Sequence, residues 1–141
     1  MQREHIEGPA PRVLLVDDDA ETLVLLRAAL EGEGIDIVGA AGDGSEVETL
    51  VEKTEPDVVL MDLRMPGMDG FEATVGIKAR YPWVQVIFLT FYEEMLPPRG
   101  PQEVGAFAYL VKGCSTELMR DVIFQARRHG SEQRWRRANR V

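Results

Sequence analysis

The 141-residue sequence has few of the residue types on which many catalytic and structural sites depend: one cysteine, Cys114, and two histidines, His5 and His129. A single cysteine excludes an intramolecular disulfide framework and a multi-cysteine zinc site. Both histidines fall outside the predicted strands, which argues against histidine metal sites and hydrolase triads. The sequence contains no G-x-S-x-G motif, and no glycine-rich loop follows the first predicted strand. A Rossmann or Walker-type nucleotide site is therefore not expected.

Long apolar runs are also absent. No run approaches the ~20 residues that a membrane-spanning helix needs, and residues 1–11 lack the apolar segment of a secretory signal. Hydrophobic residues make up 45% of the chain and charged residues 28%, which is typical of a globular domain. We therefore expect one soluble, cytoplasmic domain without a membrane partner.

The net charge of −8 is unevenly distributed along the chain. Residues 120–141 contain seven arginines against Asp121 and Glu132, a local balance of +5, which leaves −13 on the other 119 residues. An acidic body argues against direct binding of nucleic acid by the main domain. We interpret the basic residues 131–141 as a solvated, frayed C-terminal tail, with contact to an acidic partner as the alternative.

Short, wholly apolar segments alternate with helical ones behind a lead, residues 1–11, that we expect to be disordered. The apolar runs predict strands over residues 13–16, 35–41, 58–61, 84–89 and 107–111. Caps and breakers predict helices over residues 20–33, 45–54 (capped by Ser45), 69–80 and from the cap Ser115 to about His129. This alternation predicts an α/β domain over residues 12–130, with a parallel sheet covered by helices on both faces.

One segment departs from the alternation. Between the fourth and fifth predicted strands a helix is due, but residues 96–101 read LPPRGP. Proline removes an amide donor and clashes with the preceding turn, at a cost of ~3 kcal/mol or more in a helix interior. We therefore predict a disrupted fourth helix, with residues 91–103 irregular.

Polar residues follow four of the predicted strands, where the functional crevice of an open parallel sheet lies. They are Asp17, Asp18 and Asp19 after the first strand, Asp62 after the third, Thr90 after the fourth and Lys112 after the fifth. Clustered carboxylates repel one another unless a cation joins them, and oxygen ligands of this kind favour Mg²⁺. A lysine adds a point charge suited to phosphate oxygens. This set can hold Mg²⁺ and a phosphoryl group against an aspartate nucleophile.

Four motifs resemble the receiver domain of two-component response regulators. They are VLLVDDD at 13–19, VVLMDLRMPGMDG at 58–70, FLT at 88–90 and AYLVK at 108–112. The resemblance covers about residues 11–130. It implies a flavodoxin-like, doubly wound sheet of five parallel strands in the order 2-1-3-4-5. It also implies a phospho-accepting switch that is not an enzyme in the turnover sense.

The resemblance also implies roles for individual residues. Asp62 would accept a phosphoryl group from a phosphohistidine of a sensor histidine kinase. Mg²⁺ would be held by Asp17, Asp18, Asp62 and the backbone carbonyl of Arg64. Asp19 is better explained as the cap of the first helix than as a metal ligand.

The remaining implied roles concern the phosphoryl oxygens and the switch. Lys112 would pair with Asp62 and then with the phosphoryl group, onto which Thr90 would swing its hydroxyl. Tyr109 would be the aromatic side chain that switches with Thr90. A homodimer or a downstream effector would use the face of the fourth and fifth strands, and nucleic acid would be bound only by an output domain outside this chain.

Three departures from the family pattern stand out. The large side chain of Phe91 follows Thr90, where most members have a small residue, and is expected to narrow access to Asp62. Gly113 follows Lys112 in place of the common proline, and a small or polar residue there is usual in the branch with LuxR-type DNA-binding domains. The proline-rich segment lies where the fourth helix, part of the usual output face, belongs.

Two other functions are compatible with parts of the sequence. A phosphorylation-independent scaffold with a receiver fold is favoured by Phe91 and the proline segment, and opposed by the complete set of acids, threonine and lysine. A haloacid-dehalogenase-like phosphatase also uses an aspartyl phosphate. Its D-x-D-x-T/V pattern fails here because position 21 is Glu21.

Overall fold

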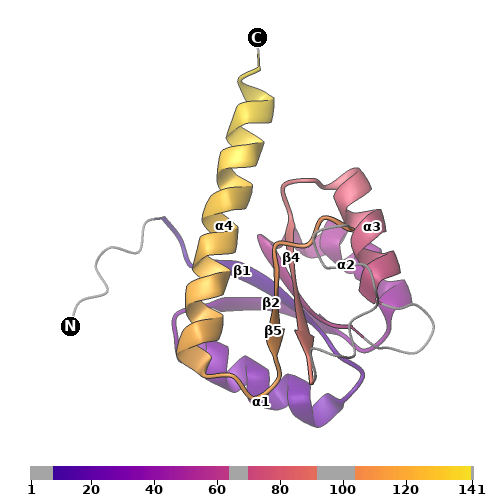
Figure 1. The fold of residues 1–141 in the computed structure, drawn as a ribbon, viewed down its shortest axis with the longest axis vertical. Helices are drawn as coiled ribbons and strands as arrows, with labels where there is room; N and C mark the ends of the chain where they lie inside the picture. The colour runs from indigo at the N-terminus through magenta and orange to yellow at the C-terminus, as the bar shows by residue number, and fades with distance from the viewer. Residues whose placement is uncertain (1–7, 64–69, 92–103, 141) are drawn as a thin grey trace.

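The fold is a five-stranded parallel sheet, seen in a computed structural model that describes residues 8–63, 70–91 and 104–140 (Figure 1). The strand order β2-β1-β3-β4-β5 confirms the predicted doubly wound, flavodoxin-like topology. All neighbouring strands pair in parallel. The strands are β1 Arg12–Val16, β2 Asp36–Ala41, β3 Val58–Asp62, β4 Gln85–Thr90 and β5 Ala108–Val111.

Four α-helices and one 3₁₀ turn are present in the described part of the chain. They are α1 Ala20–Glu31, η1 Gly44–Glu46, α2 Val47–Thr54, α3 Gly70–Arg80 and α4 Thr116–Ala138. In Figure 1, α1 and α4 lie on one side of the sheet and α2 and α3 on the other. None of these helices is long and apolar enough to cross a membrane.

The sheet is buried on both faces because successive side chains of an apolar strand point to opposite sides. Leu14 and Val16 of β1 belong to the core layer under α2 and α3. Val13 and Leu15 belong to the layer under α1 and α4. All four side chains are at most 2% exposed. Because helices cover both faces of the sheet, its strands have apolar side chains on both faces. The wholly apolar runs in the sequence therefore predicted the strands correctly.

Two of the predicted helix caps are confirmed and one is wrong. The Asp19 carboxylate accepts hydrogen bonds from the amide of Glu21 (3.3 Å) and the hydroxyl of Thr22 (2.7 Å) at the start of α1. Ser115 Oγ accepts from the Leu118 amide (3.0 Å) at the start of α4. Ser45, the predicted cap of α2, lies inside η1, and its amide donates to the carboxylate of Asp43 (2.9 Å). A short 3₁₀ turn capped by Asp43 therefore precedes α2.

Helix α4 is longer than predicted. It was expected to end near His129 and give way to a frayed tail over residues 131–141, but it continues to Ala138. Gly130 is buried and lies so close to the loop before β4 that an added Cβ would collide with the Trp83 carbonyl oxygen. One turn later, Gln133 Oε1 accepts a hydrogen bond from Gln85 Nε2 (3.1 Å). These contacts hold α4 against the body of the domain past His129, the predicted end of the helix.

Part of the lead is attached to the domain. The Pro9 carbonyl accepts from Arg127 Nη1 (2.7 Å), and the carbonyl of the buried Pro11 accepts from the Asp36 amide (2.9 Å). The expectation of disorder is therefore wrong for these residues, and residues 1–7 lie outside the described part. The predicted disruption of the fourth helix falls almost entirely on residues 92–103, which also lie outside it.

Candidate phosphoryl-accepting site

Three aspartates meet at the carboxyl edge of the sheet, at the ends of β1 and β3. The register pairs Val16 of β1 with Met61 of β3, so Asp17 and Asp62 leave neighbouring strands at the same level. Asp17 is 2% exposed, its amide donates to the Ala41 carbonyl (2.9 Å), and its Oδ1 accepts from the Asp19 amide (2.9 Å). Asp18 points to the surface. The backbone of this turn therefore fixes Asp17 inward and leaves Asp18 open to solvent.

The three carboxylates are close enough to share a cation. Asp17, Asp18 and Asp62 each offer one oxygen, and these oxygens lie within 4.8 Å of one another. Oxygens around an octahedral Mg²⁺ lie about 3–4 Å apart, given metal–oxygen distances of about 2 Å. This donor set fits Mg²⁺, which prefers oxygen ligands and completes its shell with water. The predicted fourth ligand, the carbonyl of Arg64, lies outside the described residues.

Lys112 supplies the positive charge of the site. Its Nζ donates to Asp17 Oδ2 at 2.9 Å and lies 3.6 Å from Asp62 Oδ2. Burial favours the neutral amine, but the hydrogen bond to Asp17 and the charges of Asp62 and Asp17 outweigh it. The pKa of Lys112 is therefore raised above its usual value. With one ammonium against three carboxylates, the cluster keeps a surplus of negative charge that a divalent cation would offset.

Thr90 ends β4 beside this cluster. It is 6% exposed, and its carbonyl accepts a hydrogen bond from the Lys112 amide (2.6 Å), which ties the ends of β4 and β5 together. Tyr109 pairs with Phe88 in the β4–β5 register, two positions before the pair of Thr90 and Val111. Its half-buried ring packs against the core layer under α2 and α3. The structure thus brings Thr90 and Lys112 to one edge and places Tyr109 farther down β5.

Two contacts in the site could not be foreseen from the sequence. The resemblance implied that Lys112 pairs with Asp62, whereas its shorter contact is with Asp17. The ring of Phe91, 62% exposed, lies with its centroid 4.7 Å from Lys112 Nζ, in a cation–π contact. A large residue after Thr90 was a visible signal, but nothing in the sequence pointed to Lys112 as the side chain that it covers.

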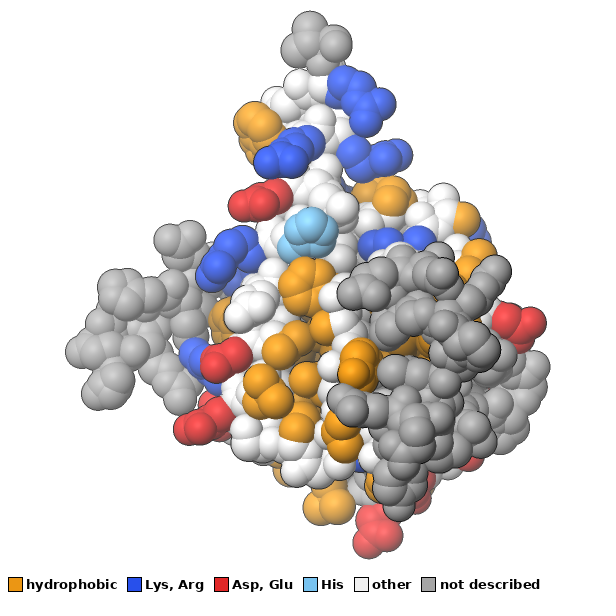
Figure 2. Space-filling view, viewed as in Figure 1, with side chains coloured by type: hydrophobic (Ala, Val, Ile, Leu, Met, Phe, Trp, Pro, Cys, Tyr) orange, Lys and Arg blue, Asp and Glu red, His pale blue; other side chains and the backbone are white. Residues whose placement is uncertain are grey.

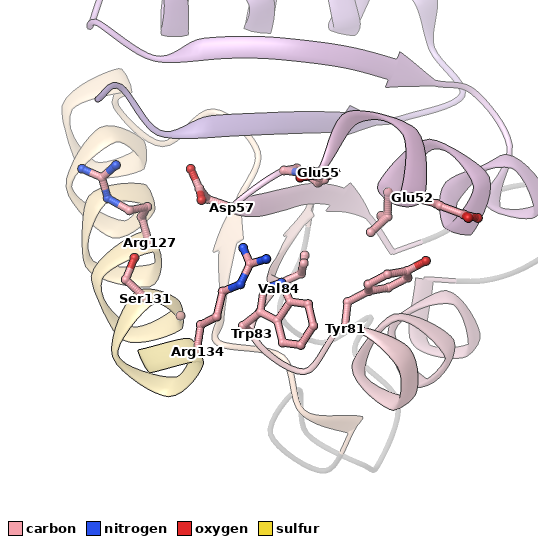
Figure 3. Close-up of a pocket in the computed structure, with 12 residues that line it drawn as sticks. Glu52, Glu55, Asp57, Tyr81, Trp83, Val84, Arg127, Ser131 and Arg134 are labelled. Atoms are coloured by element: carbon pink, nitrogen blue, oxygen red, sulfur yellow. The ribbon is translucent and has the colours of Figure 1, made fainter. Parts of the chain in front are cut away.

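A cavity of about 360 Å³ lies at the amino ends of β3 and β4, the opposite edge of the sheet (Figure 3). Arg127 and Arg134 of α4 line one side, and Glu52 and Asp57 line the other. The Arg134 guanidinium stands over the Trp83 ring at 4.9 Å. The sequence did not predict this cavity, because no motif marks the loops that form it.

The topology, with an acidic cluster and a lysine at the carboxyl edge, defines a phosphoryl-accepting α/β domain of the receiver type. The family model of the response regulator receiver domain matches residues 13–124. The chain belongs to this family, whose members are the receiver domains of response regulators in two-component systems.

Relatives support the same assignment. The chain is 37% identical over 115 residues to the response regulator GacA of Pseudomonas aeruginosa, covering 81% of this chain and 54% of that protein. It is 41% identical over 104 residues to the transcriptional regulatory protein PdtaR of Mycobacterium tuberculosis, covering 74% and 50%. The chain thus spans about half the length of these relatives. A crystal structure of the receiver domain of an HD domain-containing protein from Pseudomonas fluorescens superposes with a TM-score of 0.81 at 26% identity, covering 92% and 96%.

Proposed function

We propose that Asp62 is the phospho-acceptor of this receiver domain and takes its phosphoryl group from a phosphohistidine of a sensor histidine kinase. The observation that carries the proposal is the position of Lys112 Nζ, 2.9 Å from Asp17 and 3.6 Å from Asp62. An ammonium held between two carboxylates is placed to bind the oxygens of a phosphoryl group that is transferred to one of them. Asp62 is the member of the pair at the end of the central strand β3, with its side chain 13% exposed.

The step joins a carboxylate oxygen of Asp62 to phosphorus while the bond from phosphorus to the imidazole nitrogen breaks. The imidazole leaves as the neutral base because its other ring nitrogen carries a proton, taken from solvent on the kinase side, so Asp62 itself transfers no proton. Lys112 and the Thr90 hydroxyl stabilise the charge on the transferring oxygens. Mg²⁺, held by Asp17, Asp18 and Asp62 with the Arg64 carbonyl, would neutralise the remaining oxygen charge.

The phosphorylated domain acts as a switch in a cytoplasmic phosphorelay. It is not an enzyme in the turnover sense. Thr90 ends β4, and its carbonyl is tied to the amide that follows β5. A hydroxyl that moves onto the phosphoryl group would therefore bias the β4–β5 edge, and Tyr109 on β5 is the side chain expected to follow. A second copy of the chain, in a homodimer, or a downstream effector would bind at this β4–β5 edge.

Phosphorylation by a small donor tests the proposal. Wild-type protein with Mg²⁺ and acetyl phosphate should gain the mass of one phosphoryl group, and chelation of Mg²⁺ should abolish the gain. Asp18→Ala should lose most of the labelling, whereas Asp43→Ala, a carboxylate outside the cluster, should keep it. Full labelling of Asp18→Ala would contradict the assigned metal ligands.

A second candidate function is a scaffold that binds its partner without phosphorylation. The contact of the Phe91 ring with Lys112 favours it, because this ring stands beside the ammonium that a phosphoryl group must reach. Phe91→Ala separates the two functions. We expect faster labelling of this variant by acetyl phosphate, since removal of the ring opens the approach to Lys112. A wild-type protein and a Phe91→Ala variant that both resist labelling would favour the scaffold.

A further inference from the structure

The last turn of α4 lies beyond the contacts of this helix with the body of the domain. The buried residues of this helix are Met119, Ile123, Ala126 and Gly130, and no later residue is buried in the described part. The last contacts with the body are the hydrogen bond between Gln133 and Gln85 and the stacking of Arg134 over Trp83. Figure 3 shows Arg134 beside Trp83. Beyond them the helix projects past the sheet (Figure 1). At 1.5 Å per residue, Ala138 stands about 12 Å beyond Gly130.

The projecting part is chemically unlike the rest of the chain. Residues 134–140, called here the basic helix end, carry four arginines and no acid. Among the described residues, Arg136, Arg137 and Arg140 form no ion pair, and Trp135 is 66% exposed. Figure 2 shows lysine or arginine side chains gathered with hydrophobic ones at this end of the molecule. Arginines near a helix C-terminus also complement the helix dipole, but this does not account for a solvated tryptophan among them.

We propose that the basic helix end binds single-stranded nucleic acid. Arginine guanidinium groups match phosphate oxygens, and an exposed indole offers a face on which an unpaired base can stack. The pairing of charge with a bare aromatic ring is the usual chemistry of sequence-tolerant single-strand binding. The proposal departs from the expectation that only an output domain outside this chain would bind nucleic acid. It keeps the expectation for the acidic main domain, because the strand would contact only the basic helix end.

The position of the basic helix end makes such binding compatible with the acidic body. The 119 residues before position 120 carry a net charge of −13, which repels a polyanion. Ala138 lies about 12 Å along the helix from the last buried residue, Gly130, and the Debye length at 0.1 M salt is about 10 Å, so the repulsion at the end of the helix is partly screened at this salt concentration. A membrane surface fits less well, because an interfacial helix needs a continuous apolar face and Trp135 is the one large apolar side chain in residues 134–140.

Fluorescence anisotropy of a labelled oligothymidylate of about 15 nucleotides tests the proposal on the full chain. We expect saturable binding at about 20 mM salt that weakens roughly a hundredfold at about 200 mM, as about three neutralised phosphates require. Trp135→Ala should weaken binding by at least about fivefold, since one stacked base is lost. Arg137→Gln should weaken it and lower the salt dependence. Arg27→Gln, the same charge change on the exposed face of α1, should leave it unchanged.

Three results would overturn the proposal. The first is the absence of binding at the low salt concentration. The second is an equal effect of Arg137→Gln and Arg27→Gln, which would assign the binding to net charge alone. The third is equal or tighter binding of poly-glutamate, of anionic lipid vesicles or of a duplex, which would assign the helix end to another kind of partner. None of these readouts depends on phosphorylation. The test of this proposal is therefore independent of whether Asp62 is the phospho-acceptor.

Discussion

The ammonium of Lys112 lies 2.9 Å from Asp17, although 95 positions separate the two residues in the chain. They meet because β1 and β5 run in the same direction in one sheet, so the residues that follow both strands emerge at one edge. Asp62, on the strand next to β1, lies 3.6 Å from the same nitrogen. Lys112 thus offsets part of the repulsion within the acidic cluster.

Removal of this charge should destabilise the metal-free protein. Lys112→Met leaves three carboxylates within 4.8 Å of one another without their cation. We expect the free energy of unfolding to fall by about 2–4 kcal/mol in chelator, because the variant leaves uncompensated charge in a largely buried site. Added Mg²⁺ should recover much of the loss. Urea denaturation with and without Mg²⁺ measures both effects, with the exposed Lys53→Met as control. A loss that Mg²⁺ does not reduce would contradict this role of Lys112.

Gly130→Ala should also destabilise the fold, although alanine is the better helix former. The propensity gain is about 1 kcal/mol. Against it, the new Cβ would collide with the Trp83 carbonyl oxygen, a backbone atom whose displacement shifts the loop before β4. Overpacking of this kind costs about 1–3 kcal/mol, so we expect a net loss in urea denaturation. Gly32→Ala is the matched control, since its nearest neighbour would lie 3.4 Å away. Equal stability of Gly130→Ala and the wild type would show that α4 does not rest on this loop.

Lys78 should give the protein a pH-dependent stability above neutrality. Its Nζ donates to the carbonyls of Pro82 (2.7 Å) and Val84 (2.8 Å), and burial lowers its pKa from 10.5 to about 8. Below pH 8 the lysine is charged in both the folded and the unfolded state, and the folded state bears the full free-energy cost of burying the charge. Between pH 8 and 10.5 the unfolded chain holds more protons, so the free energy of unfolding rises with pH.

The difference between the wild type and Lys78→Met isolates this contribution from other groups that titrate in the same range. It should grow in favour of the wild type between pH 8 and 10.5, by on the order of 1 kcal/mol after allowance for a half-exposed side chain. Unfolding in urea at a series of pH values measures it. A flat difference, or one that falls with pH, would mean that the buried ammonium keeps an ordinary pKa.

The strands and the acidic edge could be predicted from the sequence because both follow from one rule. A parallel strand buried on both faces is wholly apolar, so Val13, Leu14, Leu15 and Val16 mark β1, and the first polar residue after it stands at the functional edge. The order of the sheet and the meeting of Asp17 with Asp62 required the family resemblance, since periodicity alone does not set which strands are neighbours.

Other features depend on tertiary contacts that no local pattern records. Gly130 has the sequence character of a helix stop, but in the fold it permits close approach to Trp83. Ser45 does not cap α2 because it lies inside the 3₁₀ turn η1, which Asp43 caps through the Ser45 amide, and α2 itself begins without a side-chain cap. The preference of Lys112 for Asp17 is set by differences of less than 1 Å between side chains from three strands.

The most direct test of the account is the chemical identity of the phosphorylated residue. Wild-type protein phosphorylated in the presence of Mg²⁺ can be reduced with borohydride, which converts an aspartyl phosphate to homoserine, and then mapped by peptide mass spectrometry. The account predicts homoserine at position 62 alone, and none in Asp62→Asn, which keeps the shape of the side chain but removes the nucleophile. Homoserine at another aspartate of the wild type, or phosphate retained by Asp62→Asn, would contradict it.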